Sequence, residues 1–365
     1  MQYPNYENGL VNLSNSILRD FGVEPKHSSL PYLDEILAKG FQNVVLMIFD
    51  GMGVSSLERH LPEESFLRRH CKQAISSIFP PTTTAALTSI ESGLTPAEHG
   101  WLGWSVYFKE LDQIVELFPN TVKDSGGVLA AEYHVAGKYL PYRKISGDIN
   151  KAGIGKMFTV SPYDGCRVDQ LNSLFATVRR LSRKPGRKYI YAYWNQPDKC
   201  MHETGCESEQ ARNEIVTINQ GVEALCASLK DTLVIVAADH GHIDIRYRFV
   251  EDYPDVMNAL LRPPAIESRA VAFYVKEECM AAFPQEFQKA FGNEFLLFSK
   301  NEVIAKGIFG NGTRHARFAE SIGDYLAVAV SDVAIANNQE CKQFVSTHAG
   351  LTPQEMNVPL IVIET

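Results

Sequence analysis

Six aspartate and histidine side chains, in four short segments of this sequence, together have the composition of a metal site. They are Asp50, Asp198, His202, Asp239, His240 and His348. Zinc accepts histidine nitrogen and aspartate oxygen, and catalytic zinc sites keep one position open for water or substrate. Six ligands divide into two sites of three, and a pair of cations about 3.5–4 Å apart is a known arrangement for phosphoryl chemistry.

The spacing of these residues favours a shared site. Asp198 and His202 are four residues apart, which on a helical turn puts both on one face. Asp239 and His240 are adjacent at the end of an apolar segment, where a loop can direct both toward one ion. Taken singly, Asp50 would be a turn residue more often than a metal ligand, and Asp198 and His202 are equally well a helix cap with an exposed histidine. The motif DHGH is more specific, because two histidines and an aspartate within four residues rarely serve packing.

Three consecutive threonines, Thr82 to Thr84, follow two prolines and precede a helical pattern. The residue before a proline is pushed away from helical geometry, and AALTSIES is typical of a short helix that Gly93 closes. The threonines then lie at a helix N-terminus, where free N–H groups and the helix dipole favour an anionic group. We expect one hydroxyl to cap the helix. Another, beside a metal ion that lowers its pKa, becomes a nucleophile for phosphorus.

Apolar runs separated by helical patterns predict the elements that position these groups. The segments 43–50, 188–194 and 231–239 are near-continuous apolar runs, suited to central strands of a parallel sheet covered on both faces. An amphipathic stripe from Ile215 to Leu229 predicts a helix between the last two, which completes a right-handed βαβ unit. Ligands of such sheets bind outside the carboxyl ends of the strands. The predicted fold class is α/β, with a mostly parallel central sheet and helices on both faces.

Residues 253–342 have a different pattern, in which strand-like segments alternate with short helical pieces. They predict a smaller α+β insertion that shapes the substrate pocket, with a return to the main sheet near 345–363. The catalytic core would then comprise residues 1–252 and 343–365. The glycine-rich, weakly periodic segment 127–156 predicts loops near the site.

Composition narrows the classes of function. The chain has 365 residues, a formal net charge of −8 and no basic run, so it is a poor non-specific binder of nucleic acid. Seven scattered cysteines without a CxxC pair argue against a cysteine zinc site or a disulfide framework, and they suit a reducing compartment. Neither a signal peptide nor a run of about 18 apolar residues is visible. We expect a cytoplasmic protein that does not enter the membrane, of unknown oligomeric state.

Five motifs resemble successive signatures of the alkaline phosphatase superfamily, and most closely its type I phosphodiesterase/nucleotide pyrophosphatase branch. In chain order they are LMIFDGMG, FPPTTTAALTSIESGLTPAEHG, NQPDKCMHETG, VAADHGHID and THAGLTPQEMNVPLIV. The resemblance runs from about residue 43 to the C-terminus and implies an alkaline phosphatase-like fold with two zinc ions, manganese being the alternative. It implies two ligand sets, one of Asp198, His202 and His348, the other of Asp50, Asp239, His240 and the nucleophile's oxygen.

The resemblance also implies the nucleophile and the reaction. In the family, the nucleophilic threonine lies ten residues before a glycine that is followed by Leu-x-Pro; the matching glycine is Gly93, and 93 − 10 selects Thr83. Thr83 would attack the phosphorus of a small phosphorylated substrate such as a nucleotide. A phosphothreonine would form, and water would then hydrolyse it. The implied activity is zinc-dependent hydrolysis of phosphodiester or pyrophosphate bonds.

Two positions depart from the family pattern. Nucleotide pyrophosphatases usually carry an asparagine that binds a phosphoryl oxygen, and the matching position here is Trp104, whose indole N–H is its side chain's hydrogen-bond donor. His242 replaces the more usual residue after DHG, and it either supports the metal ligands or is a surface histidine. We expect Trp104, Thr84 and His242 to contact substrate. His99 would support its loop.

Other activities remain as alternatives. A phosphonate or phosphomonoester hydrolase on the same scaffold is the second reading, since phosphonoacetate hydrolase is similar in pattern. A cofactor-independent phosphoglycerate mutase is disfavoured, because that family uses serine and a large insertion for which the 115 residues between Thr83 and Asp198 are too few (198 − 83 = 115). A sulfatase is disfavoured, because no cysteine or serine stands at the nucleophile position. The non-enzymatic alternative is an inactive metal-binding domain.

Overall fold

The computed structural model describes residues 1–341 and 343–365, and its larger sheet has seven strands. Their order is β2 (Cys71–Ser76), β18 (Asn357–Glu364), β9 (Thr232–Ala237), β1 (Asn43–Phe49), β8 (Lys188–Trp194), β6 (Lys156–Ser161) and β7 (Cys166–Arg167). Neighbours from β9 to β7 are parallel, and β18 runs antiparallel to both β9 and β2. The mostly parallel sheet is therefore confirmed, and the C-terminal return is antiparallel.

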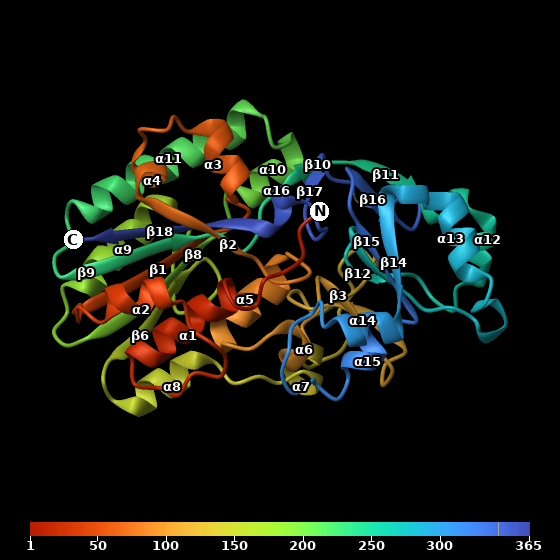
Figure 1. Ribbon diagram of the computed structural model, residues 1–365, viewed down its shortest axis with the longest axis horizontal. Helices are drawn as coiled ribbons and strands as arrows, with labels where there is room; N and C mark the ends of the chain where they lie inside the picture. Colours follow the sequence, from red (N-terminus) through yellow and green to blue (C-terminus); the bar gives the residue numbers. More distant parts are fainter. Residues whose placement is uncertain (342) are drawn as a thin grey trace.

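Helices cover both faces of this main sheet (Figure 1), as expected for strands buried from end to end. One face carries α3 (Val54–His60), α4 (Phe66–His70), α9 (Leu171–Ser182), α10 (Asp198–Thr204) and α11 (Glu209–Cys226). The other carries α1 (Leu10–Asp20), α2 (Pro31–Leu37), α5 (Thr83–Ser92) and α8 (Ile145–Ala152). The predicted amphipathic helix is α11, whose apolar stripe of Ile215, Ile218, Val222 and Leu225 is buried.

A second, antiparallel sheet lies beside the first and has its own apolar core (Figure 1). Its strands are β14 (Phe295–Ser299), β15 (Tyr325–Ala329), β13 (Ala270–Phe273), β12 (Ala265–Ile266), β3 (Ser105–Phe108), β4 (Gln113–Glu116) and β5 (Thr121–Val122). Strands β3 to β5 thus join the strands of the predicted insertion although they precede its start by more than 130 residues (253 − 122 = 131). The boundaries of the insertion stay a prediction, and Lys342, where it was expected to end, lies outside the described residues.

Short helices complete the second sheet and the connections. They are α6 (Pro96–His99), α7 (Val135–Tyr139), η1 (Val250–Asp252), α12 (Pro254–Ala259), η2 (Glu277–Cys279), α13 (Phe283–Phe291), η3 (Gly292–Glu294), α14 (Lys300–Lys306), α15 (Phe318–Ser321) and α16 (Pro353–Met356). The prediction of loops for residues 127–156 is wrong in part, because this segment contains α7 and α8. In α8, Ile145 and Ile149 are four residues apart and both buried, a single helical stripe too short to recognise by periodicity.

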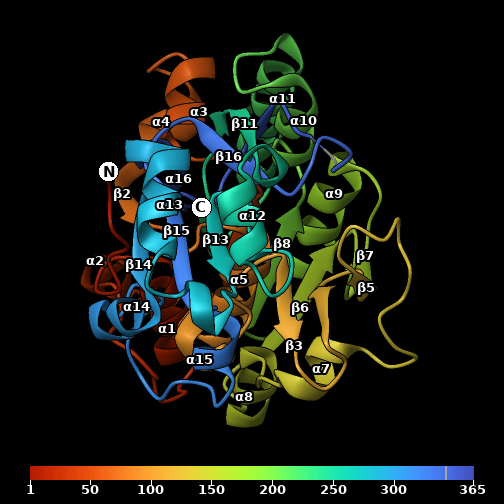
Figure 2. The ribbon, with the colours of Figure 1, turned by 90° about the vertical axis from the view of Figure 1, so that its right-hand side faces the viewer.

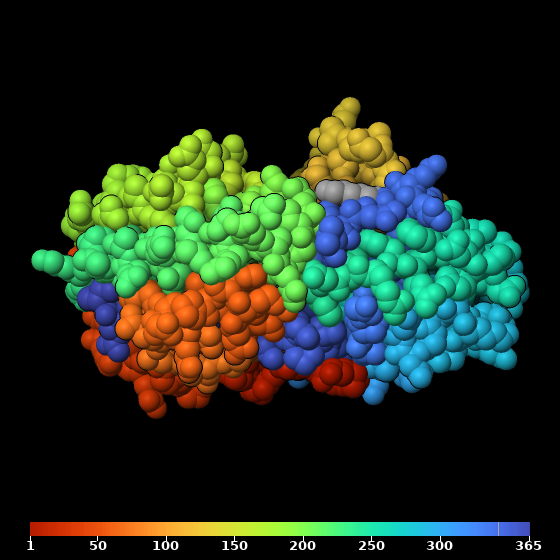
Figure 3. All heavy atoms as spheres, turned by 90° about the horizontal axis from the view of Figure 1, so that it is seen from above, coloured from red at the N-terminus to blue at the C-terminus, as the bar shows by residue number. Residues whose placement is uncertain are grey.

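Two small strand pairs tie the segment after β9 to the segment before β18. β10 (Ile243–Asp244) pairs antiparallel with β17 (Ser346–Thr347), and β11 (Arg246–Phe249) runs parallel to β16 (Val333–Ala336), beside it in Figure 2. Figure 3 shows the resulting elongated shape, with segments of the main sheet at one end and cyan and blue segments of the second sheet at the other. In the described chain, no helix is both long and apolar enough to cross a bilayer.

Candidate metal centre

Adjacent strands of the main sheet bring the predicted ligands to one edge. Asp50 follows β1, Asp198 opens α10 shortly after β8, and Asp239 follows β9; these three strands are neighbours in the sheet. Gly51 permits the close approach: its φ is +72°, and a Cβ there would lie 2.9 Å from the Asp198 Cβ and 3.1 Å from the His242 Cδ2. The pairing of β10 with β17 delivers His348 to the same edge.

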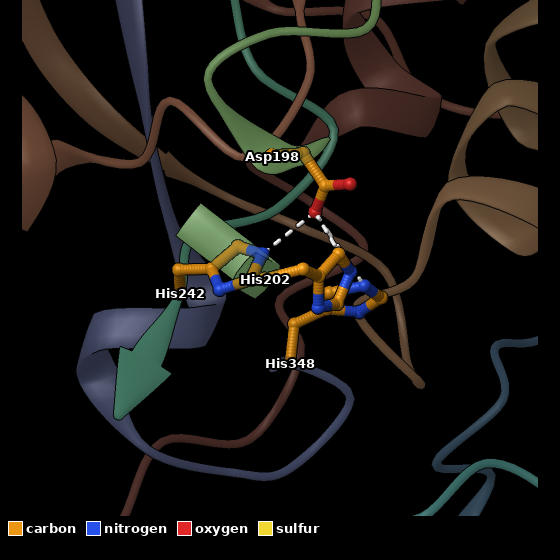
Figure 4. Close-up of side chains that lie close together, drawn as sticks. All are labelled: Asp198, His202, His242 and His348. Atoms are coloured by element: carbon orange, nitrogen blue, oxygen red, sulfur yellow. Dashed lines mark hydrogen bonds and ion pairs between the residues drawn. The ribbon is translucent and has the colours of Figure 1, made fainter. Parts of the chain in front are cut away.

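Four of the side chains form what we call the imidazole-rich cluster (Figure 4): Asp198, His202, His242 and His348. Their ligand atoms all lie within 4.8 Å of one another. The Oδ1 atom of Asp198 is 2.6 Å from His242 Nε2, 3.4 Å from His202 Nε2 and 3.7 Å from His348 Nε2. The two residues of α10 therefore share one helix face, as their spacing predicts, and His242 joins them.

Three side chains with Thr83 form the carboxylate-rich cluster: Asp50, Asp239 and His240. The Thr83 Oγ1 atom lies 3.2 Å from His240 Nε2 and 3.4 Å and 3.5 Å from the two oxygens of Asp50. His240 Nε2 lies 3.3 Å from Asp50 Oδ1 and 3.5 Å from Asp239 Oδ2. The rings of His240 and His348 stack with centroids 3.7 Å apart, so the two clusters adjoin.

Burial and neighbouring charges raise the pKa values of two groups in the carboxylate-rich cluster and lower those of two histidines in the imidazole-rich cluster. Burial and the charge of Asp50 raise the pKa of Asp239 well above its usual range. Burial alone would lower the pKa of His240, but Asp239 and the other carboxylates outweigh it and raise that pKa to about 10. In the imidazole-rich cluster, burial and the charge of His240 lower the pKa of His348. Burial lowers the pKa of His242 to about 4.

The residues present fit divalent cations. Asp239 Oδ1 accepts the backbone N–H groups of Gly51 and His240, at 3.1 Å and 3.0 Å, whereas its buried Oδ2 accepts no hydrogen bond from any residue that the structure describes. Such an orphaned buried oxygen is costly unless a cation binds it. The Nδ1 atoms of His202 and His348 donate to the carbonyl oxygens of Ser346 and Pro81, which leaves each Nε2 as a lone pair directed into the cluster.

The threonine segment departs from one expectation. Thr82 occupies the N-cap position of α5, as predicted for one of the three, but its hydroxyl makes no capping hydrogen bond. It donates instead to Glu267 Oε1 at 2.6 Å. The prediction of a side-chain cap is therefore wrong, because a carboxylate from the second sheet competes for the hydroxyl. Gly93 does close the helix, with φ +69°.

Two cavities meet at the nucleophile. One, of about 480 Å³, is lined by Glu267 and by residues of the imidazole-rich cluster. The other, of about 650 Å³, is lined by Asp50 and by aromatic rings. Thr83, Trp104, Asp198 and Lys199 line both.

Of the three residues that we expected to contact substrate, one lines the cavities and two do not. The Trp104 side chain is 39 % exposed and lines both cavities. Thr84 is fully buried and His242 is 2 % exposed, and neither lines them. His242 is therefore no surface histidine. His99 is buried, contacts Ser89 Oγ at 3.0 Å and accepts the backbone N–H of Trp101, which suits the expected support of its loop.

Sequence reasoning missed two residues of the site. Tyr193, on β8, donates its hydroxyl to Asp50 Oδ2 and lines the larger cavity. Glu267 Oε1 accepts the backbone N–H of Trp104 at 2.7 Å as well as the Thr82 hydroxyl, and burial raises the pKa of Glu267 to about 7. Tyr193 precedes a predicted ligand loop by five residues, which is a weak signal. Glu267 has none, because its neighbours are more than 160 residues away.

Comparisons with known proteins identify structures of similar fold and a matching family model. The murine ectonucleotide pyrophosphatase/phosphodiesterase 5 structure shares 15 % identity, with a TM-score of 0.66 over 88 % of each chain. Phosphonoacetate hydrolase from Sinorhizobium meliloti 1021, solved in complex with phosphonoformate, shares 15 % identity, with a TM-score of 0.62 over 87 % of this chain and 89 % of that chain. A search of curated proteins found no match. The family model "Type I phosphodiesterase / nucleotide pyrophosphatase" matches residues 44–350. The chain therefore belongs to the type I phosphodiesterase/nucleotide pyrophosphatase family, whose members are phosphoric ester hydrolases.

Proposed function

We propose that the chain hydrolyses a phosphodiester or pyrophosphate bond of a small phosphorylated substrate, with Thr83 as the nucleophile beside two divalent cations. The observation that carries this proposal is the position of the Thr83 hydroxyl, within 3.5 Å of Asp50 and His240 and at the N-terminus of α5. Zinc is the cation that mixed imidazole and carboxylate ligands favour.

The residues of the chain have distinct roles in this proposal. Asp50 accepts a hydrogen bond from the Thr83 hydroxyl and so aims its oxygen, while Tyr193 holds Asp50 from behind. The first-turn N–H groups of α5 have no partner inside the helix and are suited to oxygens of a phosphoryl group. Because Glu267 takes the Thr82 hydroxyl, that side chain does not compete for these N–H groups.

The reaction proceeds in two displacements. The Thr83 oxygen forms a bond to phosphorus, and the bond from phosphorus to the leaving oxygen breaks with its electron pair. The leaving oxygen takes up the proton that the Thr83 hydroxyl loses. Water then bonds to phosphorus, the bond from phosphorus to the Thr83 oxygen breaks, one proton of water restores the Thr83 hydroxyl, and the phosphate product leaves. Cations bound by Asp198, His202 and His348 and by Asp50, Asp239 and His240 would supply Lewis-acid stabilisation of the attacking and leaving oxygens.

The two cavities that Thr83 lines favour a phosphodiester or pyrophosphate over a monoester. Such a substrate carries a group on each side of the reacting phosphorus, and each cavity offers room for one. The larger cavity is lined by Trp101, Phe118 and Tyr163 among other aromatic residues, a surface suited to a flat ring. An inactive variant of the murine ectonucleotide pyrophosphatase/phosphodiesterase 5 has been solved in complex with AMP, which supports a nucleotide as one candidate substrate.

A phosphonate or phosphomonoester hydrolase is the second candidate. It is favoured by Trp104, which stands where the nucleotide pyrophosphatases have an amide side chain, and by Glu267, whose carboxyl lies beside the Trp104 backbone. The similarity to phosphonoacetate hydrolase supports the same reading.

Turnover of three chromogenic esters by the zinc-loaded protein separates these candidates. We expect kcat/KM to be at least about tenfold higher for bis-p-nitrophenyl phosphate than for p-nitrophenyl phosphate, and for thymidine 5′-monophosphate p-nitrophenyl ester to be turned over as well. A preference for the monoester would favour the second candidate. If protein that holds stoichiometric metal turns over none of these esters, the candidate that remains is an inactive metal-binding domain.

A further inference from the structure

The two ring nitrogens of His242 each contact a different side chain. Nδ1 lies 2.9 Å from Ser346 Oγ, and Nε2 lies 2.6 Å from Asp198 Oδ1. The imidazole itself is completely buried. In Figure 4, His242 lies to the left below Asp198, and His202 and His348 lie to the right below it, so that all three rings face the same carboxylate. The protonation of this ring can therefore be worked out from its contacts.

The hydroxyl of Ser346 decides which nitrogen of His242 carries the proton. Ser346 Oγ lies 2.6 Å from the backbone oxygen of Met201, which only accepts, so the single hydroxyl proton is used there. Ser346 Oγ must then accept from His242 Nδ1–H. In the neutral ring, Nε2 is a lone pair that faces a carboxylate oxygen at 2.6 Å. Two lone pairs at this distance repel each other, and a cation bound by both atoms removes that repulsion.

The same tautomer occurs in all three histidines of the imidazole-rich cluster. Nδ1 of His202 donates to Ser346 O at 2.8 Å, and Nδ1 of His348 donates to Pro81 O at 3.0 Å. Each ring is thus held through Nδ1 and presents Nε2 to Asp198 Oδ1. Four ligand atoms around zinc lie roughly 3.3 Å apart, given metal–ligand distances of about 2.0–2.1 Å. The separations of 3.4 Å and 3.7 Å are close to this value, and the 2.6 Å contact needs to open by less than about 1 Å.

We propose that His242 is a fourth protein ligand of the cation held by Asp198, His202 and His348, so that this position is a four-ligand His3Asp site. The proposal rests on the divalent centre of the proposed function but not on its substrate. Four protein ligands are typical of zinc sites that hold their ion, whereas three leave a position open for water or substrate. The imidazole-rich cluster is therefore the position that fills first, and its ion would take a substrate oxygen as a fifth ligand, whereas the carboxylate-rich cluster keeps a position open.

The alternative role for His242 is to carry a proton and support Asp198 from outside the coordination shell. Loss of such a supporting residue also weakens metal binding, by about 10- to 100-fold, so affinity alone does not separate the two roles. The number of imidazoles bound to the ion does separate them. A ligand role predicts three imidazoles at the first site filled, and a supporting role predicts two.

X-ray absorption at the zinc edge of the full-length protein, loaded with one equivalent of zinc, counts these imidazoles directly. We expect three in the wild type and two in His242→Gln, which keeps a hydrogen-bonding side chain near Ser346. Cobalt(II) titration gives a second readout, since four-coordinate cobalt absorbs visible light far more strongly than five- or six-coordinate cobalt. We expect an intense first-equivalent spectrum that His242→Gln weakens.

A matched control is His99→Gln, which replaces another buried histidine outside both clusters and should leave the count at three. Two imidazoles in the wild type would overturn the proposal even if the variant fails to fold, because that measurement needs no variant. Identical spectra for folded His242→Gln and wild type would overturn it as well. Failure of the wild type to bind zinc or cobalt at all would instead refute the divalent centre on which the proposed function depends.

Discussion

The two clusters at the site differ in charge and in how firmly their side chains are held. In the imidazole-rich cluster, three imidazole rings surround one carboxylate, and each ring is fixed through Nδ1 by an oxygen atom. In the carboxylate-rich cluster, two buried carboxylates face one ring, and Asp239 Oδ2 has no hydrogen-bond partner among the described residues. The first cluster is preformed for a cation. The second holds excess negative charge that a cation or protons must neutralise.

The largest expected effect is on Thr83, which belongs to the carboxylate-rich cluster. Thr83→Ala removes the oxygen that attacks phosphorus but no side chain that fixes an ion by charge. We expect kcat to fall at least about 1,000-fold with the metal content unchanged, as measured by steady-state kinetics and elemental analysis. Thr83→Ser, which keeps a hydroxyl, should retain part of the activity. Near-normal turnover of the alanine variant would transfer the role to Thr82 or Thr84.

The second largest expected effect is a loss of folding stability. It concerns a buried ion pair that holds the loop after His348, a member of the imidazole-rich cluster. Arg269 and Glu355 form a fully buried bidentate pair, at 2.7 Å and 2.8 Å, and Glu355 also accepts the Gly350 N–H. Glu355→Gln leaves the buried guanidinium without its counter-charge, so unfolding free energy should fall by about 3–5 kcal/mol. Chemical denaturation of the metal-free protein measures this.

A control for this variant is Glu364→Gln, which breaks the exposed contact with Lys39. Those side chains are 45 % and 55 % exposed, and pairs of this kind contribute about 0–1 kcal/mol. Equal losses of stability in the two variants would contradict a structural role for the buried pair.

Each cluster should account for one of the two zinc ions that the wild type binds. Asp239→Asn removes a charge from the carboxylate-rich cluster, and His202→Gln removes a lone pair from the imidazole-rich one. We expect each variant to bind one equivalent of zinc as tightly as the wild type and the second equivalent more weakly, because the altered cluster has lost one ligand; elemental analysis after dialysis against increasing chelator measures this. Two tightly bound equivalents in either variant would refute the assignment of that ligand.

The smallest and most specific effect is the pH dependence of metal binding by these two variants. His240, whose pKa is raised to about 10, is protonated at neutral pH in the metal-free protein, and a cation at the carboxylate-rich cluster must displace that proton. In His202→Gln, zinc affinity should therefore rise about tenfold per pH unit between pH 6 and 8. In Asp239→Asn, the remaining cluster contains His242, whose pKa is lowered to about 4, and affinity should change little. Calorimetric titration across this range measures both.

Parts of this comparison were visible in the sequence, and others depended on tertiary packing. The strand predicted at 188–194 is β8 residue for residue, because every residue there except Trp194 is buried and the run is apolar after Lys188. Asp198 and His202 share a face because helical spacing is local. Glu267 and Tyr193 escaped prediction since their partners, Thr82 and Asp50, are distant in sequence. The same applies to β3, whose pairing with β12 is a long-range contact that no local pattern encodes.

Zinc-edge anomalous diffraction from crystals of the zinc-loaded protein tests the central claim most directly. The account predicts two anomalous peaks about 3.5–4 Å apart, one among Asp198, His202, His242 and His348, and the other among Asp50, Asp239, His240 and the Thr83 oxygen. Absence of both peaks, or peaks bound by other residues away from Thr83, would contradict it.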